Sequence, residues 1–512
     1  MDRSTKTIIA TLSVPAFMIG TDFTGALMLV IPIEHEFSSD ITTTQWVLNV
    51  YALTLAMTLV AGGRLGDMFG RRRVLLIGLV VFFASALVCT VAPSIAWLIG
   101  ARAVQGVGAA LIWPCVLAIA VTSVEEEERG TVMALTIGAV SIGNVAAPFF
   151  AGIVAGLGEW RLFFLVNVIM AALSAVLVLR FLAKDTMERS DERIDYLGMI
   201  VLSLAVFALL YALDVGADWG WGSLRVIALF LLSVALLVAF PLVEKRIAQP
   251  MVPPPMLRNR PFLRALATNG LVSPAMFLLF LYMPQYLHEV LGWTVVWAAI
   301  GTLPLLVSLC VLNLTAGRFY TRIGPRWLLS AGHALTVVGA LWVTVLVPSW
   351  GYAGVVPPMV LVGVGCGMIF GPAGTAAVNA ADPSRAGLAG GLSFMFHLGL
   401  GAIGVGGATA LMFAASQTAI AEGLERIGVT MSAADQLAIR SGEVHTQAAK
   451  EVLDRYGPEV AAKIQSVVGG AFTDGMHIAY SLALAFAVLG LIFSLGLDET
   501  KLRGVDQEAT AD

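Results

Sequence analysis

The stretch GGRLGDMFGRRR, residues 62–73, joins two long apolar runs of the chain. Its glycines permit a tight reversal of the backbone, and its charged side chains can pair with one another or meet helix termini. The runs on either side, 45–63 and 74–93, are each close to the roughly 20 residues that cross a bilayer as a helix. The sequence therefore predicts a short polar turn between two membrane-spanning helices.

Apolar runs of this kind fill most of the 512 residues, which are 58% hydrophobic and 12% charged. A soluble chain is about 45–50% apolar and about 25% charged. This chain could not hide its apolar surface in a soluble fold, so lipid must be its solvent. We expect an all-α integral membrane protein. Its fourteen predicted spans are 8–33, 45–63, 74–93, 96–121, 131–157, 160–182, 195–214, 224–243, 262–287, 295–317, 327–347, 352–379, 386–415 and 473–497.

The distribution of basic residues predicts the orientation. Of the 30 Lys and Arg, 22 lie in the terminal segments and in the loops on the side of the N-terminus, and the opposite short loops hold only Arg161 and Arg225. Cytoplasmic loops carry the excess of basic residues in membrane proteins. We therefore expect a multi-pass protein of the cell membrane with both termini in the cytoplasm.

The chain also repeats itself. Residues 62–73 align with AGRFYTRIGPRW, residues 316–327, and each copy follows the second helix of a six-helix set. Parallel halves with a binding site between them are a known transporter plan. We expect an N-terminal six-helix bundle, two inserted helices, a C-terminal six-helix bundle and a cytoplasmic tail, with boundaries 1–182, 183–261, 262–497 and 498–512.

The predicted C-terminal bundle includes one sizeable external loop, 416–472. Its apolar residues recur at helical spacing, which predicts two or three short amphipathic helices on the outer face. This loop is either a cap over an exit path or a passive connector.

Four motifs are similar to those of a known family. They are Gly63-x-Leu65-x-Asp67-x-x-Gly70-Arg71-Arg72, Leu98-x-x-x-Arg102-x-x-Gln105-Gly106, Gly143 with Ala147-Pro148-x-x-Ala151-Gly152, and Thr21-Asp22-x-Thr24. Together they resemble the major facilitator superfamily, in particular its fourteen-helix drug:proton antiporter branch. The resemblance implies two six-helix bundles that alternate access to a central site.

The resemblance implies a conformational latch in the first motif, at Gly63, Asp67, Gly70, Arg71 and Arg72. In the second copy Thr321 stands where Asp67 stands in the first, so a weaker latch is expected there.

The resemblance implies proton coupling at Asp22 and Arg102. Ionisable residues inside spans are costly and mark functional sites by default. Asp22 is the most isolated carboxylate within the predicted spans, and it is expected to favour its neutral form unless a neighbour stabilises the anion.

The resemblance also implies an antiporter motif in the fifth helix, at Gly143, Pro148 and Gly152. Small residues allow helices to approach closely, and proline bends a helix. Ala147 and Ala151 stand where the family pattern has glycine, which weakens the export assignment.

Aromatic and polar side chains near the expected cavity suit lipophilic cations through apolar and cation–π contacts. The candidate cavity residues are Thr24, Trp46, Tyr51, Gln105, Trp113, Tyr282, Phe394 and His397. Asp214 is expected at the outer end of its helix, in contact with solvent. Asp214, Glu289 and His397 are further groups that could titrate.

These features predict a secondary transporter and not an enzyme. The chain has no G-x-x-x-x-G-K-[ST] loop for ATP, so an ion gradient must drive it, and no cofactor, metal site or nucleic-acid partner is expected. We expect a monomer that exports small lipophilic, cationic drugs in exchange for protons. Two alternatives remain: a proton-coupled exporter of one host metabolite, lipid or antibiotic, and a transport-inactive membrane receptor or assembly factor.

Overall fold

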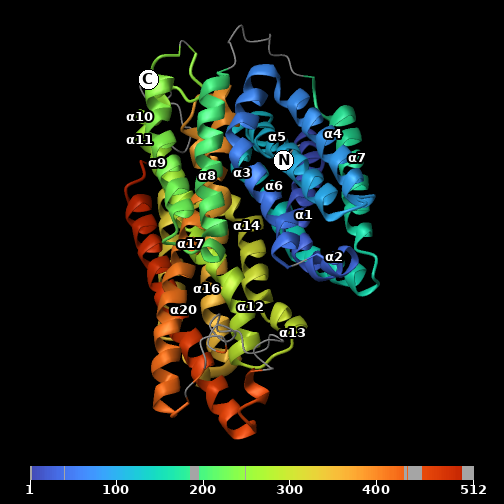
Figure 1. Cartoon of the computed structure of the whole chain (residues 1–512). Coiled ribbons are helices and arrows are strands. Elements are labelled where there is room, and N and C mark those ends of the chain that lie inside the picture. Colours follow the sequence, from blue (N-terminus) through green and yellow to red (C-terminus); the bar gives the residue numbers. More distant parts are fainter. Residues whose placement is uncertain are drawn as a thin grey trace.

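A computed structural model describes residues 3–39, 41–184, 195–247, 249–429, 431, 435 and 452–498. Within these residues every regular element is helical (Figure 1). A helix pairs its backbone N–H and C=O groups within its own segment, which is what a lipid solvent requires.

The elements follow one another with short connections. The first half and the inserted pair comprise α1 (Arg3–Gly25), η1 (Ala26–Leu29), α2 (Val30–Phe37), α3 (Ile41–Phe69), α4 (Arg71–Thr90), α5 (Ile95–Thr122), α6 (Glu126–Gly156), α7 (Arg161–Phe181), α8 (Tyr196–Trp219) and α9 (Leu224–Glu244). The remaining elements are α10 (Pro254–Arg258), α11 (Arg260–Leu271), α12 (Ser273–Gln285), η2 (Tyr286–Val290), α13 (Val295–Gly301), α14 (Leu303–Ile323), α15 (Pro325–Val343), η3 (Pro348–Trp350), α16 (Gly351–Asn379), η4 (Pro383–Arg385), α17 (Ala386–Arg426) and α20 (Pro458–Leu495).

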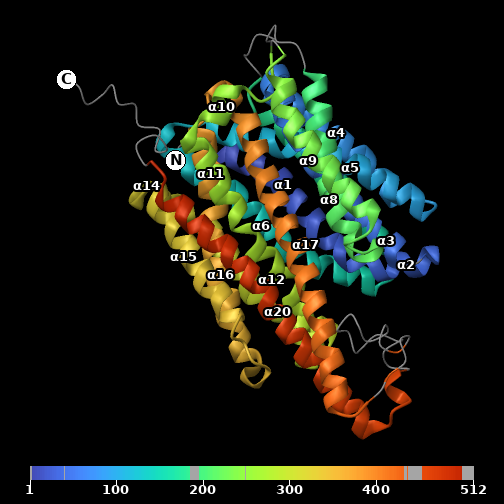
Figure 2. The same ribbon diagram turned by 60° about the vertical axis from the view of Figure 1, so that its left-hand side comes forward.

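The helices form two groups, α1–α7 on one side and α11–α20 on the other (Figure 1). The groups meet where α3 and α5 pack against α17 and where α6 packs against α14 and α16. The inserted helices α8 and α9 pack on each other, and α8 also contacts α3 and α17 (Figure 2). The inserted pair therefore touches both groups along one side of their junction. The predicted domain boundaries themselves stay predictions.

Thirteen helices of the described residues are long and apolar enough to cross a membrane. The predicted span 327–347 is not one of these thirteen; it coincides with α15, which packs against α16 and α20. Arg326 and His333 lower the mean hydropathy of α15, and its status as a span stays a prediction. The protein is thus a multi-pass, all-helical membrane protein.

Several predicted spans are not continuous helices. The expected span 8–33 ends as an α-helix at Gly25 and continues through η1 into α2. The expected span 262–287 is divided at Val272, ahead of Pro274. A proline cannot donate to the carbonyl one turn earlier, so the helix is interrupted beside it. Hydrophobicity alone predicted that these segments cross the membrane, but it did not predict where their helices are interrupted.

The helices that flank the predicted external loop 416–472 continue into it at both ends, and its place outside the membrane stays a prediction. Helix α17 runs on to Arg426 and α20 begins at Pro458. Apolar side chains on the two extensions, including Ile420, Leu424, Ile464 and Val468, pack into one cluster. The amphipathic spacing therefore reflects one helix packing on another. Most of 430–451 lies outside the described residues, as do the predicted short helices there.

The sequence repeat has a structural counterpart. Gly70 joins α3 to α4 with φ of 98°, and Gly324 joins α14 to α15 with φ of 83°. A positive φ is easy for glycine and costly for other residues. The two copies therefore use the same left-handed junction between corresponding helices of the two halves.

Candidate functional site

Asp22 and Arg102 form an ion pair in the interior of the first group of helices. Arg102 Nη1 lies 2.7 Å from Asp22 Oδ2, and the two residues are 1% and 0% exposed. Arg102 also donates from Nη1 to Gln105 Oε1 at 2.9 Å and from Nε to the Val47 carbonyl at 3.0 Å. Charge-assisted hydrogen bonds of this length are strong, and the pair is neutral as a unit.

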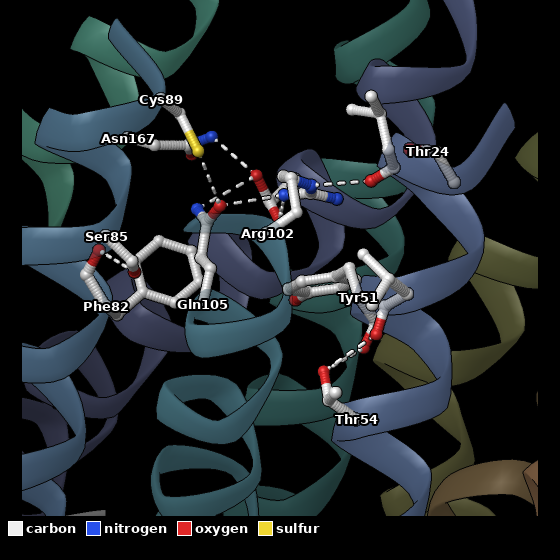
Figure 3. Close-up of polar contacts among 12 residues, drawn as sticks. Thr24, Tyr51, Thr54, Phe82, Ser85, Cys89, Arg102, Gln105 and Asn167 are labelled. Carbon is white, nitrogen blue, oxygen red and sulfur yellow. Dashed lines mark hydrogen bonds and ion pairs between the residues drawn. The ribbon is translucent and has the colours of Figure 1, made fainter. Parts of the chain in front are cut away.

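Two further side chains complete a network around the Asp22 carboxylate. Asn167 donates to Asp22 Oδ1 at 2.8 Å and Gln105 donates to the same atom at 3.3 Å. The Arg102 guanidinium lies 4.1 Å from the centre of the Tyr51 ring (Figure 3). These residues come from α1, α3, α5 and α7, so the network joins four helices. A proton on Asp22 would remove the charge that holds Arg102 and two amide groups in place.

Asp22 was predicted to be the most isolated carboxylate within the spans, and the structure gives this carboxylate three hydrogen-bond donors. The predicted partner Arg102 is one of them, because the i, i+3 spacing of Arg102 and Gln105 places both on the same face of α5. Asn167 is the donor that the sequence reading left without a role. A polar side chain inside an apolar span was the available signal.

The Asp67 carboxylate bridges the two halves. Its Oδ1 accepts from the N–H of Gly387 at 3.0 Å, and its Oδ2 accepts from the N–H of Leu388 at 2.8 Å. Both donors are in the first turn of α17, where N–H groups have no intrahelical partner and the helix dipole favours an anion. Arg71 Nε donates to Asp67 Oδ1 at 3.0 Å and Arg71 Nη1 to Thr122 at 2.8 Å. We call this junction the latch end.

The other predicted latch residues take different positions. A Cβ on Gly63 would come within 2.3 Å of the Gly387 carbonyl oxygen, so α3 and α17 can touch only because Gly63 has no side chain. Gly70 forms the left-handed junction described above. Arg72 instead donates from Nη2 to the Leu179 carbonyl at 3.0 Å, at the end of α7. Arg72 therefore ties α4 to α7 within one half.

The predicted antiporter motif lies on α6. A Cβ on Gly143 would come within 2.4 Å of the Phe17 carbonyl oxygen, so this glycine allows α1 and α6 to pack closely. Gly152 has nothing within 4 Å of an added Cβ. The side chain of Pro148 lies outside the described part of the chain. Of the two motif glycines, Gly143 alone is needed for close helix packing.

A central cavity of about 90 Å³ lies between the two halves. Phe394 and His397, both predicted cavity residues, line it. The His397 ring stacks on Phe394 at 5.9 Å and lies 4.5 Å from Phe370, and its Nδ1 contacts Ser273 Oγ at 2.6 Å. The cavity is thus an aromatic box with a histidine in its wall.

The remaining predicted cavity residues lie around the pocket or away from it. Trp113 packs on Phe394 at 5.2 Å, and Tyr282 hydrogen-bonds Thr409. Trp46 packs on Tyr211 of α8 at 5.6 Å. The others serve structural contacts: Tyr51 and Gln105 in the Asp22 network, and Thr24 in hydrogen bonds to the Gly20 and Asn144 carbonyls.

Sequence reasoning missed several polar residues of the central cavity. Asn313 donates to Ser141 Oγ at 2.8 Å across the junction of the two halves, and Asn144 lines the same cavity. The Oδ1 atoms of Asn144 and Asn313 are buried and have no hydrogen-bond partner among the residues that the structure describes. Each asparagine lies in a predicted span, so polarity within lipid was again the usable signal.

At the end of α2, Glu36 binds the start of α7. Arg161 Nη1 and Trp160 Nε1 both donate to its carboxylate. Partial burial acts to raise the pKa of Glu36, but these hydrogen bonds and the Arg161 charge outweigh it and lower that pKa below its usual 4.5. Among the described residues no group of three or more His, Cys, Asp and Glu could hold a metal ion.

Two helical halves with a cavity between them, a polar contact across their junction and a buried ion pair in one half are the features of a membrane transporter. Residues 12–405 match the sequence profile of the Major Facilitator Superfamily. The chain belongs to this family.

The most similar curated proteins include resistance proteins of actinobacteria. The puromycin resistance protein pur8 of Streptomyces alboniger is 33% identical over 70% of this chain and 72% of its own length. The multidrug resistance protein Stp of Mycobacterium tuberculosis is 30% identical over 75% of this chain and 72% of its own length. The tetracenomycin C resistance and export protein of Streptomyces glaucescens is 26% identical over 96% of this chain and 91% of its own length.

Solved transporters share the fold at low sequence identity. The human organic anion transporter MFSD10 (TETRAN) superposes with a TM-score of 0.59 at 13% identity, over 96% of this chain and all of its own. A bacterial homolog of the human lysosomal transporter Spinster, inward-facing and unoccupied, superposes with a TM-score of 0.54 at 16% identity. The match covers 96% of this chain and 98% of the homolog.

Proposed function

We propose that the protein is a proton-coupled exporter of small lipophilic drugs that works by alternating access, with the latch end facing the cytoplasm. The buried Asp22–Arg102 pair carries the proposal, because it is a titratable group held by four helices of one half. Resistance proteins among the relatives support export as the direction.

The geometry supports an indirect form of coupling. Asp22 lines neither the central cavity nor the larger one beside it, whereas its neighbour Phe23 lines both. Direct competition of substrate and proton for Asp22 therefore has no support from the cavities. A proton would instead convert the carboxylate to a neutral acid, release Arg102 from its ion pair and change the contacts among α1, α3, α5 and α7. Substrate bound between the halves would then shift the packing of the same four helices.

Transport in proteoliposomes tests this proposal. Asp22→Asn keeps the shape of the side chain and removes its charge and its proton site. We expect this variant to lose uphill export and substrate-induced proton release while it still binds substrate. Gly100→Ala on α5, where an added Cβ meets nothing within 4 Å, is a matched control and should retain coupling. Full proton-driven export by Asp22→Asn would refute the assignment.

A second candidate is export of one compound made by the host. A relative that covers 96% of this chain is a tetracenomycin C resistance and export protein, which favours this second candidate. A resistance panel in an efflux-deficient host separates the two: a broad profile supports multidrug export and a single compound supports the dedicated exporter. A transport-inactive receptor would instead tolerate changes at both Asp22 and Arg102.

A further inference from the structure

A second cavity, of about 390 Å³, lies against the inserted helix α8. Its size is in the range of small-molecule sites, which are about 300–1,000 Å³. Its walls come from α1, α3, α8, α12 and α17 and from the turn after α8. The lining residues are Phe23, Asn49, Ala52, Leu53, Ala56, Leu210, Leu213, Asp214, Trp221, Phe277, Leu398, Ala402, Val405, Gly406 and Thr409.

Among the described residues that line this cavity, Asp214 alone carries a formal charge. Asn49 Nδ2 donates to Asp214 Oδ1 at 2.7 Å, which fixes the carboxylate of α8 against α3. The cavity is therefore apolar with a single anionic point.

An indole ring completes the wall next to this carboxylate. Trp221 follows the left-handed Gly220 and folds back onto α8, where a Cβ on Gly216 would come within 2.4 Å of its ring. The missing side chain at Gly216 thus lets Trp221 line the cavity. Faces of tryptophan and phenylalanine attract cations. Phe23 and Phe277 supply two more rings in the same wall.

The cavity lies away from the latch and next to the central one. Asn49 and Asp67 are both on α3, about 27 Å apart along its axis at 1.5 Å per residue. Phe23, Phe277 and Leu398 line both cavities, so the two adjoin. A substrate that leaves the central cavity away from the closed latch end would pass through the larger one.

We propose that Asp214 and Trp221 form a binding site for monovalent lipophilic cations on the release path, so that the inserted helices take part in substrate recognition. The proposal rests on the proposed function and names its substrate class. The Asp214 carboxylate supplies the charge that complements the cation, and the surrounding apolar walls accept the hydrophobic body of such a molecule.

Binding of tetraphenylphosphonium, a permanent cation, tests the site against triphenylphosphine oxide, an uncharged molecule of similar body. Full-length protein in lipid nanodiscs would be titrated with each. The wild type should prefer the cation, and Asp214→Asn should reduce that preference about tenfold. Asp214→Glu should restore most of it. A wild type that binds no tetraphenylphosphonium, or an Asp214→Asn variant with the wild-type preference, would overturn the proposal.

A second variant keeps the test valid if Asp214→Asn does not fold. Gly216→Ala should displace Trp221 and lower tetraphenylphosphonium affinity severalfold. Gly222→Ala, where an added Cβ meets nothing within 4 Å, is its matched control and should bind as the wild type does. Equal tetraphenylphosphonium affinities of these two variants would show that Trp221 is not part of the site.

The two proposals fail in different ways. Loss of the proposed function would appear as absent proton-driven export by the wild type, whatever it binds. Loss of this inference would appear as export that persists while the preference for the cation does not depend on Asp214.

Discussion

At the scale of single residues, the Asp22–Arg102 pair places two opposite charges in the interior of the first group of helices. Removing one partner of a buried ion pair leaves an uncompensated charge and costs on the order of 3–5 kcal/mol. The two partners differ, because a carboxyl group can take up a proton and become neutral whereas a guanidinium cannot lose its charge. The pair should therefore respond asymmetrically to substitution.

A double-mutant cycle measures this asymmetry. We expect Asp22→Asn to lower the unfolding temperature of the purified protein more than Arg102→Gln does, because Arg102 would stay charged and buried. The double variant should be more stable than the sum of the single effects predicts. Thermal unfolding in detergent measures all four proteins. Additive effects, or a larger loss for Arg102→Gln, would contradict the pairing.

The Glu36 contact makes an acid-sensitive tie between α2 and α7. Because the folded state lowers the pKa of Glu36, this carboxylate stabilises the fold at neutral pH, and the contribution is lost as the pH falls through the folded pKa. The unfolding temperature of the wild type should thus fall more steeply than that of Glu36→Gln between about pH 5 and pH 3. Parallel curves would show that the contact contributes nothing.

Residue roles could be predicted from sequence only where lipid made polarity costly. Asp22 and Arg102 were found because each is an ionisable residue within an apolar run. Their contacts with Asn167 and Val47 depend on how four helices pack, which one sequence does not contain. Asp214 was expected at the outer end of its helix in contact with solvent, and it is exposed. Its hydrogen bond to Asn49, on a distant helix, could not be read from its sequence neighbours.

At the scale of elements, the crossing of α3 and α17 depends on two facing glycines. A Cβ on Gly63 would lie 2.3 Å from the Gly387 oxygen, and one on Gly387 would lie 2.7 Å from the Gly63 oxygen. Backbone oxygens cannot rotate away as side chains can. The contact between the helices therefore persists only if both positions lack a side chain.

Substitution at this crossing should weaken the closed latch. We expect Gly63→Ala to separate α3 from α17 and to slow transport severalfold with little loss of substrate binding. Gly100→Ala on α5, where an added Cβ meets nothing within 4 Å, is the matched control and should transport normally. Transport rates and substrate affinity in proteoliposomes provide the comparison. A Gly63→Ala variant with a normal rate would show that the crossing tolerates a methyl group.

Element boundaries were less predictable than element identities. The apolar runs located the spans because hydrophobic length is a direct requirement of the bilayer. They did not locate the interruption at Val272 or the continuation of α17 to Arg426. The first depends on Pro274, and the second on apolar contacts between α17 and α20 that no single segment reveals.

At the scale of the whole molecule, the structure is closed at one end of the junction and hollow toward the other. Asp67 joins α3 to the start of α17, while the larger cavity extends to Thr409, about 33 Å from Gly387 along α17. With the latch end in the cytoplasm, this is an outward-facing arrangement. We assign the latch end to the cytoplasm because of the distribution of basic residues. A labelling experiment tests this orientation together with the role of the latch.

Ala402 of α17 lines the larger cavity and gives the reporter position. In a background without the four native cysteines, Ala402→Cys should react with a membrane-impermeant maleimide added outside intact cells. Adding Asp67→Asn should lower the labelling rate, because the loss of the anion at the first turn of α17 weakens the latch and populates the inward-facing state. Adding Gly100→Ala should leave the rate unchanged. Labelling that requires permeabilised cells would contradict the orientation, and a rate that Asp67→Asn leaves unchanged or raises would contradict the latch.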